Sequence, residues 1–83
     1  MQYMIMCRSL TYAQRAERLL ERAGIYSGLT KAPQGVTPEG CTFGVKLQGK
    51  HVQRALGIIR GAGIKTGKIF EISEDGKASE VKL

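Results

Sequence analysis

Apolar residues alternate with polar ones in several short stretches of the chain, which is the pattern of β-strands. The clearest stretch is residues 41–48, CTFGVKLQ, in which every second residue is apolar. Residues 2–8 are apolar on both faces, which predicts a central strand, one that can be covered on both sides. Weaker signals predict strands over residues 25–31 and 67–73.

Two further stretches carry apolar residues at helical spacing. Residues 12–23 place alanine and leucine on one face, and Thr11 is predicted to cap the helix start as part of a capping box. Residues 50–62 repeat the helical pattern. A glycine followed by isoleucine ends each stretch, at Gly24 and Gly63, so the same exit from helix to strand is predicted twice.

The order strand, helix, strand, strand, helix, strand predicts one α+β domain over residues 1–83 with the ferredoxin-like βαββαβ plan. Right-handed crossovers put the first and third strands in the middle of an antiparallel four-strand sheet, with both helices on one face. Asp75-Gly76 predicts a hairpin turn. We expect an extra C-terminal strand over residues 78–83, with a frayed tail as the alternative.

The second face of this sheet is predicted to be open. Alternation in the first strand puts one of two sets of side chains there, either Tyr3, Ile5 and Cys7 or Met4 and Met6. Open apolar faces usually mark a partner, so a homodimer through the sheet is one expectation.

Composition is that of a soluble globular domain, with 42% apolar and 24% charged residues. No apolar run is long enough for a membrane span or a signal peptide, and the expected location is the cytoplasm, where both cysteines would be thiols. The net charge of +6 suits an anionic partner such as RNA or an acidic protein face. The alternative is that the basic residues are solvent-exposed and bind no partner. The third strand offers Phe43 alone toward an aromatic RNA-binding signature, so RNA remains a weakly supported partner.

Few residues are spaced for catalysis or metal binding. Cys7, Cys41 and His51 are too few for a zinc site and lack close ligand spacing, so no metal and no cofactor are predicted. Gly35 and Gly40 mimic a phosphate-binding loop, but the lysine is missing and a strand follows where a helix is required. No paired carboxylates are seen. A carrier or binding protein is therefore favoured over an enzyme.

The irregular stretch Ala32–Gly44 is the strongest candidate for function, because it holds both prolines and Cys41 between regular elements. If the first and third strands are antiparallel neighbours, the end of one, near Cys7, lies beside the start of the other, near Cys41. The functional interpretation is a reactive Cys41 with Cys7 as a second thiol. The alternative is two buried structural cysteines, which the apolar phase of residues 41–48 favours.

Three segments together are similar to a small bacterial family, the selenium/sulfur carrier-like proteins. The segments are YMIMCRSLTYAQRAERLLERAGI, TKAPQGVTPEGCTFGVKL and GIKTGKIFEI. The resemblance covers about residues 3–72, and its most specific part is Pro33 followed by Gly40-Cys41. The family's cysteine corresponds to Cys41, and Thr42 stands where the family has glycine.

The resemblance implies a carrier that holds sulfur or selenium as a persulfide on Cys41 and exchanges it with donor and acceptor proteins. Such a thiol needs a lowered pKa. Backbone N–H groups around Gly40 and Thr42, and the charges of Arg8 and Lys31, are the candidate binding groups for the thiolate. The competing hypothesis is a binding or regulatory module in which Cys41 is structural and the open sheet face takes a protein or RNA partner.

Overall fold

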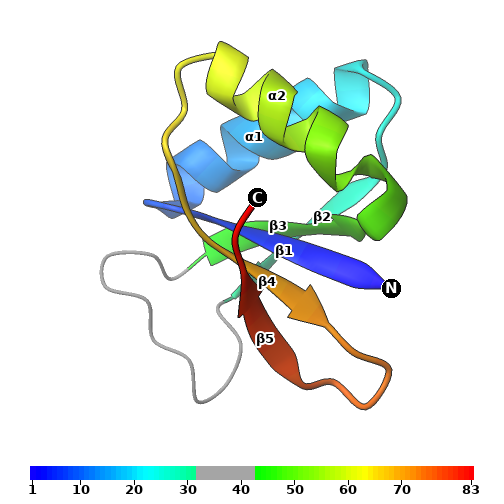
Figure 1. The fold of residues 1–83 in the computed structure, drawn as a ribbon. Coiled ribbons are helices and arrows are strands. Elements are labelled where there is room, and N and C mark those ends of the chain that lie inside the picture. Colours follow the sequence, from blue (N-terminus) through cyan, green and yellow to red (C-terminus); the bar gives the residue numbers. More distant parts are fainter. Residues whose placement is uncertain (32–42) are drawn as a thin grey trace.

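The computed structural model describes residues 1–31 and 43–83. Within them the chain forms one antiparallel sheet with two helices on one of its faces, as Figure 1 shows. The elements in chain order are β1 Gln2–Cys7, α1 Leu10–Arg22, β2 Ser27–Lys31, β3 Phe43–Gln48, the 3₁₀ turn η1 Gly49–His51, α2 Val52–Gly61, β4 Thr66–Ile72 and β5 Ala78–Val81.

The strand order across the sheet is β2-β3-β1-β4-β5, and every neighbouring pair is antiparallel. The α+β prediction is confirmed. β1 and β3 lie inside the sheet as predicted, and the first four strands follow the ferredoxin-like order. The extra C-terminal strand is confirmed as β5. A hairpin joins it to β4, with Gly76 at φ 84° and a bond from Ser73 N–H to the Lys77 carbonyl at 2.9 Å.

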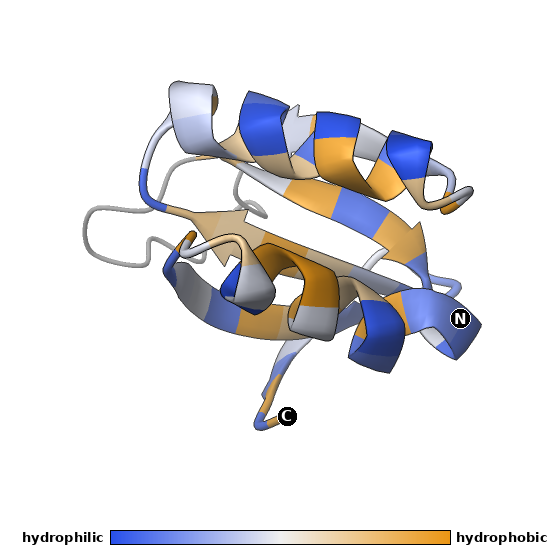
Figure 2. Cartoon of the chain, turned by 90° about the horizontal axis from the view of Figure 1, so that it is seen from above, coloured by the Kyte–Doolittle hydropathy of each residue, from blue (hydrophilic) through white to orange (hydrophobic). Residues whose placement is uncertain are grey.

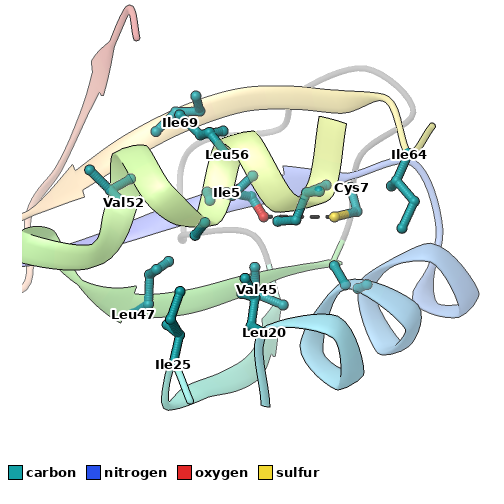
Figure 3. Packing of buried hydrophobic residues seen from close by; sticks show 14 residues of the cluster. Ile5, Cys7, Leu20, Ile25, Val45, Leu47, Val52, Leu56, Ile64 and Ile69 are labelled. Carbon is teal, nitrogen blue, oxygen red and sulfur yellow. Dashed lines mark hydrogen bonds between the residues drawn. The ribbon is translucent and has the colours of Figure 1, made fainter. Parts of the chain in front are cut away.

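The main core lies between the sheet and the helices (Figure 3). Both helices are amphipathic and alternate hydrophobic and hydrophilic bands along their length (Figure 2). Their buried side chains face the sheet, and Tyr3, Ile5 and Cys7 belong to this side of β1. The fully buried members are Ile5, Cys7, Ala13, Ala16, Leu20, Val45, Ala55 and Ile59.

A second, smaller cluster lies on the helix-free face of the sheet. Met4 and Met6 project there from β1, beside Phe70 of β4, which decides between the two sets that alternation left open. The three side chains are only 4%, 0% and 3% exposed. The prediction of an open apolar face is therefore wrong for these three residues: neither helix packs on this face, yet their side chains are buried.

The start of α1 corrects the capping prediction. Ser9, and not Thr11, is the N-cap: its backbone is extended and its hydroxyl accepts from the Tyr12 N–H at 3.3 Å. The helix begins at Leu10, ahead of the first residue with the apolar helical spacing. Periodicity misses this first turn because its residues, Leu10 among them, are exposed and carry no apolar stripe.

The predicted double exit from helix to strand is confirmed. Gly24 and Gly63 have φ values of 80° and 79°, the left-handed conformation that glycine adopts without a steric penalty. After α1, the N–H groups of Gly24 and Ile25 donate to the last free carbonyls at 3.0 and 2.8 Å. After α2, Gly63 and Ile64 do the same at 3.0 and 3.2 Å. Each glycine thereby reverses the chain so that the next residue, Ile25 or Ile64, packs in the core.

Other boundaries shift by one or two residues. β2 begins at Ser27 and not at residue 25, since Ile25 is buried below the helix exit instead of pairing in the sheet. α2 begins at Val52, after the 3₁₀ turn. Strand β3 is described from Phe43, so the prediction for residues 41 and 42 lies outside the described residues.

Candidate functional site

One row of residues crosses four strands at one end of the sheet. Lys31 at the end of β2 pairs with Phe43 at the start of β3, and Phe43 pairs with Cys7 at the end of β1. On its other side Cys7 pairs with Thr66, the first residue of β4. The prediction that the end of the first strand meets the start of the third is confirmed for these residues.

Cys7 is fully buried in this row. Its side chain is 0% exposed and its Sγ lies 3.9 Å from the carbonyl oxygen of Ile5, within the helix-side core (Figure 3). A reagent or partner protein cannot reach a thiol that is fully buried. The role of Cys7 as a second thiol therefore stays a prediction, and it would require the core to open at this strand end.

Beyond Cys7 the chain becomes basic. Arg8 follows the last residue of β1 and Lys65 precedes the first residue of β4, and those two end residues, Cys7 and Thr66, pair with each other. Arg8 and Lys65 both line a hollow of about 180 Å³ together with Tyr12 of α1 and Gly63. Tyr12 supplies an aromatic surface at the first turn of the helix, and Gly63 lines the hollow without a side chain.

The described lining of this hollow contains no carboxylate. Arg8 and Lys65 form no ion pair with any residue in 1–31 or 43–83, where the pair that does form is Lys68 with Glu80 at 3.7 Å. The first turn of α1 carries no acidic residue either, so the positive end of the helix dipole adds to the field. We call this group, Arg8, Tyr12, Gly63 and Lys65, the basic hollow. Its chemistry favours an anionic group.

Lys31, the other predicted cation, is exposed at the end of β2. It is two strands away from Cys7 in the same row, which is about 10 Å between Cα atoms at ordinary strand spacing. The structure therefore brings Cys7, Arg8 and Lys31 to one end of the sheet. The other predicted site residues, Gly40, Cys41 and Thr42, lie outside the described residues.

Sequence reasoning missed Tyr12, Gly63 and Lys65 as neighbours of Arg8. The signal was present in the predicted topology, because the residue after the first strand must lie beside the residue before an antiparallel fourth strand. Lys65 immediately precedes β4 as observed, from Thr66. The strand predicted from residue 67 puts Thr66 in that place, and the β1–β4 pairing shifts between Ile5 and Cys7, so the topology points to this end of the sheet but not to Lys65 itself.

His51 is half-buried at the end of η1. No three His, Cys, Asp or Glu side chains gather into a metal-binding group among residues 1–31 and 43–83. Neither of the two helices described is long and apolar enough to cross a membrane.

Comparison with known proteins gives one relationship. No curated protein matches the chain, and no solved structure matches it. The family model described as "Putative Se/S carrier protein-like" matches residues 2–71, which extend from β1 through nearly all of β4. The resemblance noted from the three sequence segments is thereby confirmed, and the chain belongs to the Se/S carrier protein-like family.

Proposed function

We propose that this protein is a carrier that holds a sulfur or selenium atom as a persulfide on Cys41. The observation that carries the proposal is the family match over residues 2–71, together with a basic hollow at the end of the sheet where β3 begins. Cys41 precedes the first residue of β3 by two positions in the sequence. The proposal concerns the thiol of Cys41 and the cations at that end of the sheet.

The transfer step needs no cofactor. The Cys41 thiolate attacks the terminal sulfur of a donor persulfide, forming a new S–S bond to Cys41 while the donor S–S bond breaks. The donor leaves as a thiolate, and Cys41 becomes the persulfide. Oxidation states are exchanged between the two cysteines, so no external oxidant or reductant is required. The same exchange of bonds applies when the terminal atom of the donor is selenium.

The thiolate is the reactive form, so the rate depends on the thiol pKa. Nearby cations lower a thiol pKa from its ordinary value of about 8.5 because they favour the charged form. Arg8 and Lys65 carry charge that is not neutralised by an ion pair in the described residues. The same charge would hold the anionic persulfide after transfer.

The experiment is alkylation and persulfide loading of single-thiol variants. Cys7→Ser isolates Cys41, and Cys41→Ser isolates Cys7. The Cys7→Ser protein is expected to alkylate faster than an ordinary thiol between about pH 5 and pH 8. It should also gain one sulfur atom, measured by mass spectrometry, when mixed with a cysteine desulfurase and cysteine.

Arg8→Ala and Lys65→Ala in the Cys7→Ser background are expected to raise the thiol pKa and slow both reactions. Lys50→Ala is the matched control, because Lys50 is an exposed cation in η1, at the opposite end of β3. The carrier role is abandoned if Cys41 reacts no faster than an unfolded-chain thiol and takes up no sulfur. A protein or RNA partner that binds equally well to the Cys41→Ser variant would support the binding-module hypothesis instead.

A further inference from the structure

The two edges of the sheet differ in what they offer a partner. The β5 edge is four residues long, and its Glu80 forms an ion pair with Lys68 of β4. The β2 edge is five residues long, and its middle three, Gly28, Leu29 and Thr30, are uncharged. Edge strands that lack charge present an unpaired row of backbone groups to another strand.

Exposed apolar surface gathers at the β2 edge. Tyr26, immediately before the strand, is 91% exposed, and Leu29 at its centre is 38% exposed. Tyr26 lies between two hollows of about 320 and 340 Å³ that flank the strand. Tyrosine is enriched at protein interfaces because it combines a large apolar surface with a polar tip.

Negative charge lies near the start of this edge and positive charge at its end. The hollow at the start of β2 is lined by Glu17 and Glu21 of α1, together with Ile25, Tyr26 and Ser27. The end of β2 carries Lys31. None of these three charged residues forms an ion pair with another residue of the described ranges.

We propose that two copies of this chain associate through their β2 edges, antiparallel and with Leu29 on the two-fold axis. This is the register that uses all five residues of the strand, since it sets Ser27 of one copy opposite Lys31 of the second. A two-fold contact of this kind is self-complementary, so each favourable pair occurs twice. The proposal is independent of the carrier role.

Side-chain directions agree with this register. Ser27, Leu29 and Lys31 pair within the chain with Leu47, Val45 and Phe43, all of which pack in the helix-side core. The three β2 residues therefore share the face that α1 covers. Because a two-fold axis perpendicular to the sheet keeps the faces matched, Lys31 of the second copy emerges on the side of Glu17 and Glu21.

A buried polar atom lies at the same point. The Ser27 hydroxyl oxygen is buried and has no hydrogen-bond partner among the residues that the structure describes. Buried polar groups without partners are rare because each costs free energy. An ammonium group from Lys31 of the second copy would bring a donor to this oxygen and a counter-charge to the two glutamates.

The test is a charge exchange, read by sedimentation velocity over a concentration series. The average mass of the natural protein is expected to rise from 9.1 kDa toward twice that value. Lys31→Glu, and separately the double variant Glu17→Lys/Glu21→Lys, are each expected to weaken the dimer roughly tenfold or more, since two attractions per dimer become repulsions. The triple variant should regain an affinity within about threefold of the natural protein.

Two control variants distinguish this contact from a general effect of net charge and from misfolding. Lys77→Glu changes the net charge as Lys31→Glu does, but in the exposed β4–β5 hairpin, and should leave the dimer unchanged. Leu29→Lys puts like charges together on the axis and should give a monomer with an unaltered circular dichroism spectrum. The proposal is overturned if the natural protein stays monomeric up to about 1 mM, or if the triple variant dissociates as readily as its parents. A dimer that ignores all of these changes would likewise overturn it, and would place the contact elsewhere.

Discussion

The Tyr3 hydroxyl donates a hydrogen bond to Glu71 Oε2 at 3.0 Å, joining residues 68 positions apart in the sequence. The two residues pair across β1 and β4, on the helix side of the sheet. The hydrogen bond to Glu71 raises the pKa of Tyr3 above its ordinary value of 10.0, and partial burial and the glutamate charge act in the same direction.

This relationship predicts a pH dependence in the alkaline range. A raised tyrosine pKa means that the folded state favours the neutral phenol, so the stabilisation is complete below pH 10.0 and is lost as the pH rises through the folded-state value. Tyr3→Phe should be less stable than the natural protein at pH 8 to 9, roughly, and the difference should shrink above 10.0. Urea midpoints across this range measure it. Tyr26→Phe is the control, because Tyr26 is almost fully exposed; parallel curves for the natural protein and Tyr3→Phe would contradict the prediction.

Gly44 is predicted to tolerate no side chain. A Cβ at this position of β3 would lie 2.5 Å from the Ile5 carbonyl oxygen and 3.0 Å from Met6 Sδ. Because the nearer atom is backbone, Gly44→Ala must shift β1 against β3 and should cost about 1–3 kcal/mol in the free energy of unfolding. Gly28→Ala is the matched strand variant, since its Cβ meets nothing within 4 Å. Equal denaturation midpoints for the two variants would show that the strands separate easily here.

The helix cap gives a prediction with an internal control. Ser9→Ala removes the acceptor of the Tyr12 N–H and should destabilise the protein by about 1 kcal/mol. Thr11 is the second residue of the helix, so Thr11→Ala should change stability by less than about 0.5 kcal/mol. Chemical denaturation of both variants ranks them. If Thr11→Ala proves the more damaging, the helix begins where the capping-box pattern placed it.

Two glycines at the end of α2 are predicted to respond in opposite directions. Gly63 has a φ of 79°, so Gly63→Ala forces a side chain into the left-handed region and should cost about 1 kcal/mol. Gly61 is the last residue of α2, and open space surrounds its Cβ position. Gly61→Ala should therefore stabilise the helix by up to about 1 kcal/mol. Thermal unfolding of the pair tests the sign, and loss of stability in both would mean that the helix end depends on both glycines.

Much of the fold could be predicted because periodicity and topology agree. Apolar spacing and the two glycine exits predict the helices, and the two apolar faces of β1 predict a central strand. The crossover rule then predicts the order of the strands in the sheet. The cap was mispredicted because Ser9 and Thr11 both satisfy the local preference, and only the position of the exposed first turn distinguishes them. The apolar pattern of residues 2–8 allowed for the burial of Met4 and Met6, but alternation says which residues share a face and not what covers it.

The candidate site was predictable only in part. Cys7 and Arg8 follow from the pairing of β1 with β3, which the topology implies. The Tyr3–Glu71 bond depends on the exact β1–β4 register, which shifts between Ile5 and Cys7. A register irregularity of this kind has no local sequence signature, because it is set by how the two strands twist against each other.

The short charged β5 edge limits how far the sheet can grow. A chain with two equally available edges would add copies at both ends and extend into a fibre, as edge-to-edge association does in aggregates. Here the ion pair between Lys68 and Glu80 spans the outer strand pair, so an incoming strand would meet charge along a segment of only four residues. In the proposed dimer, association through β2 would use the remaining edge of both partners at once. The difference between the two edges would then keep the assembly finite, and Glu80→Val with Lys68→Val is expected to let further copies add at β5.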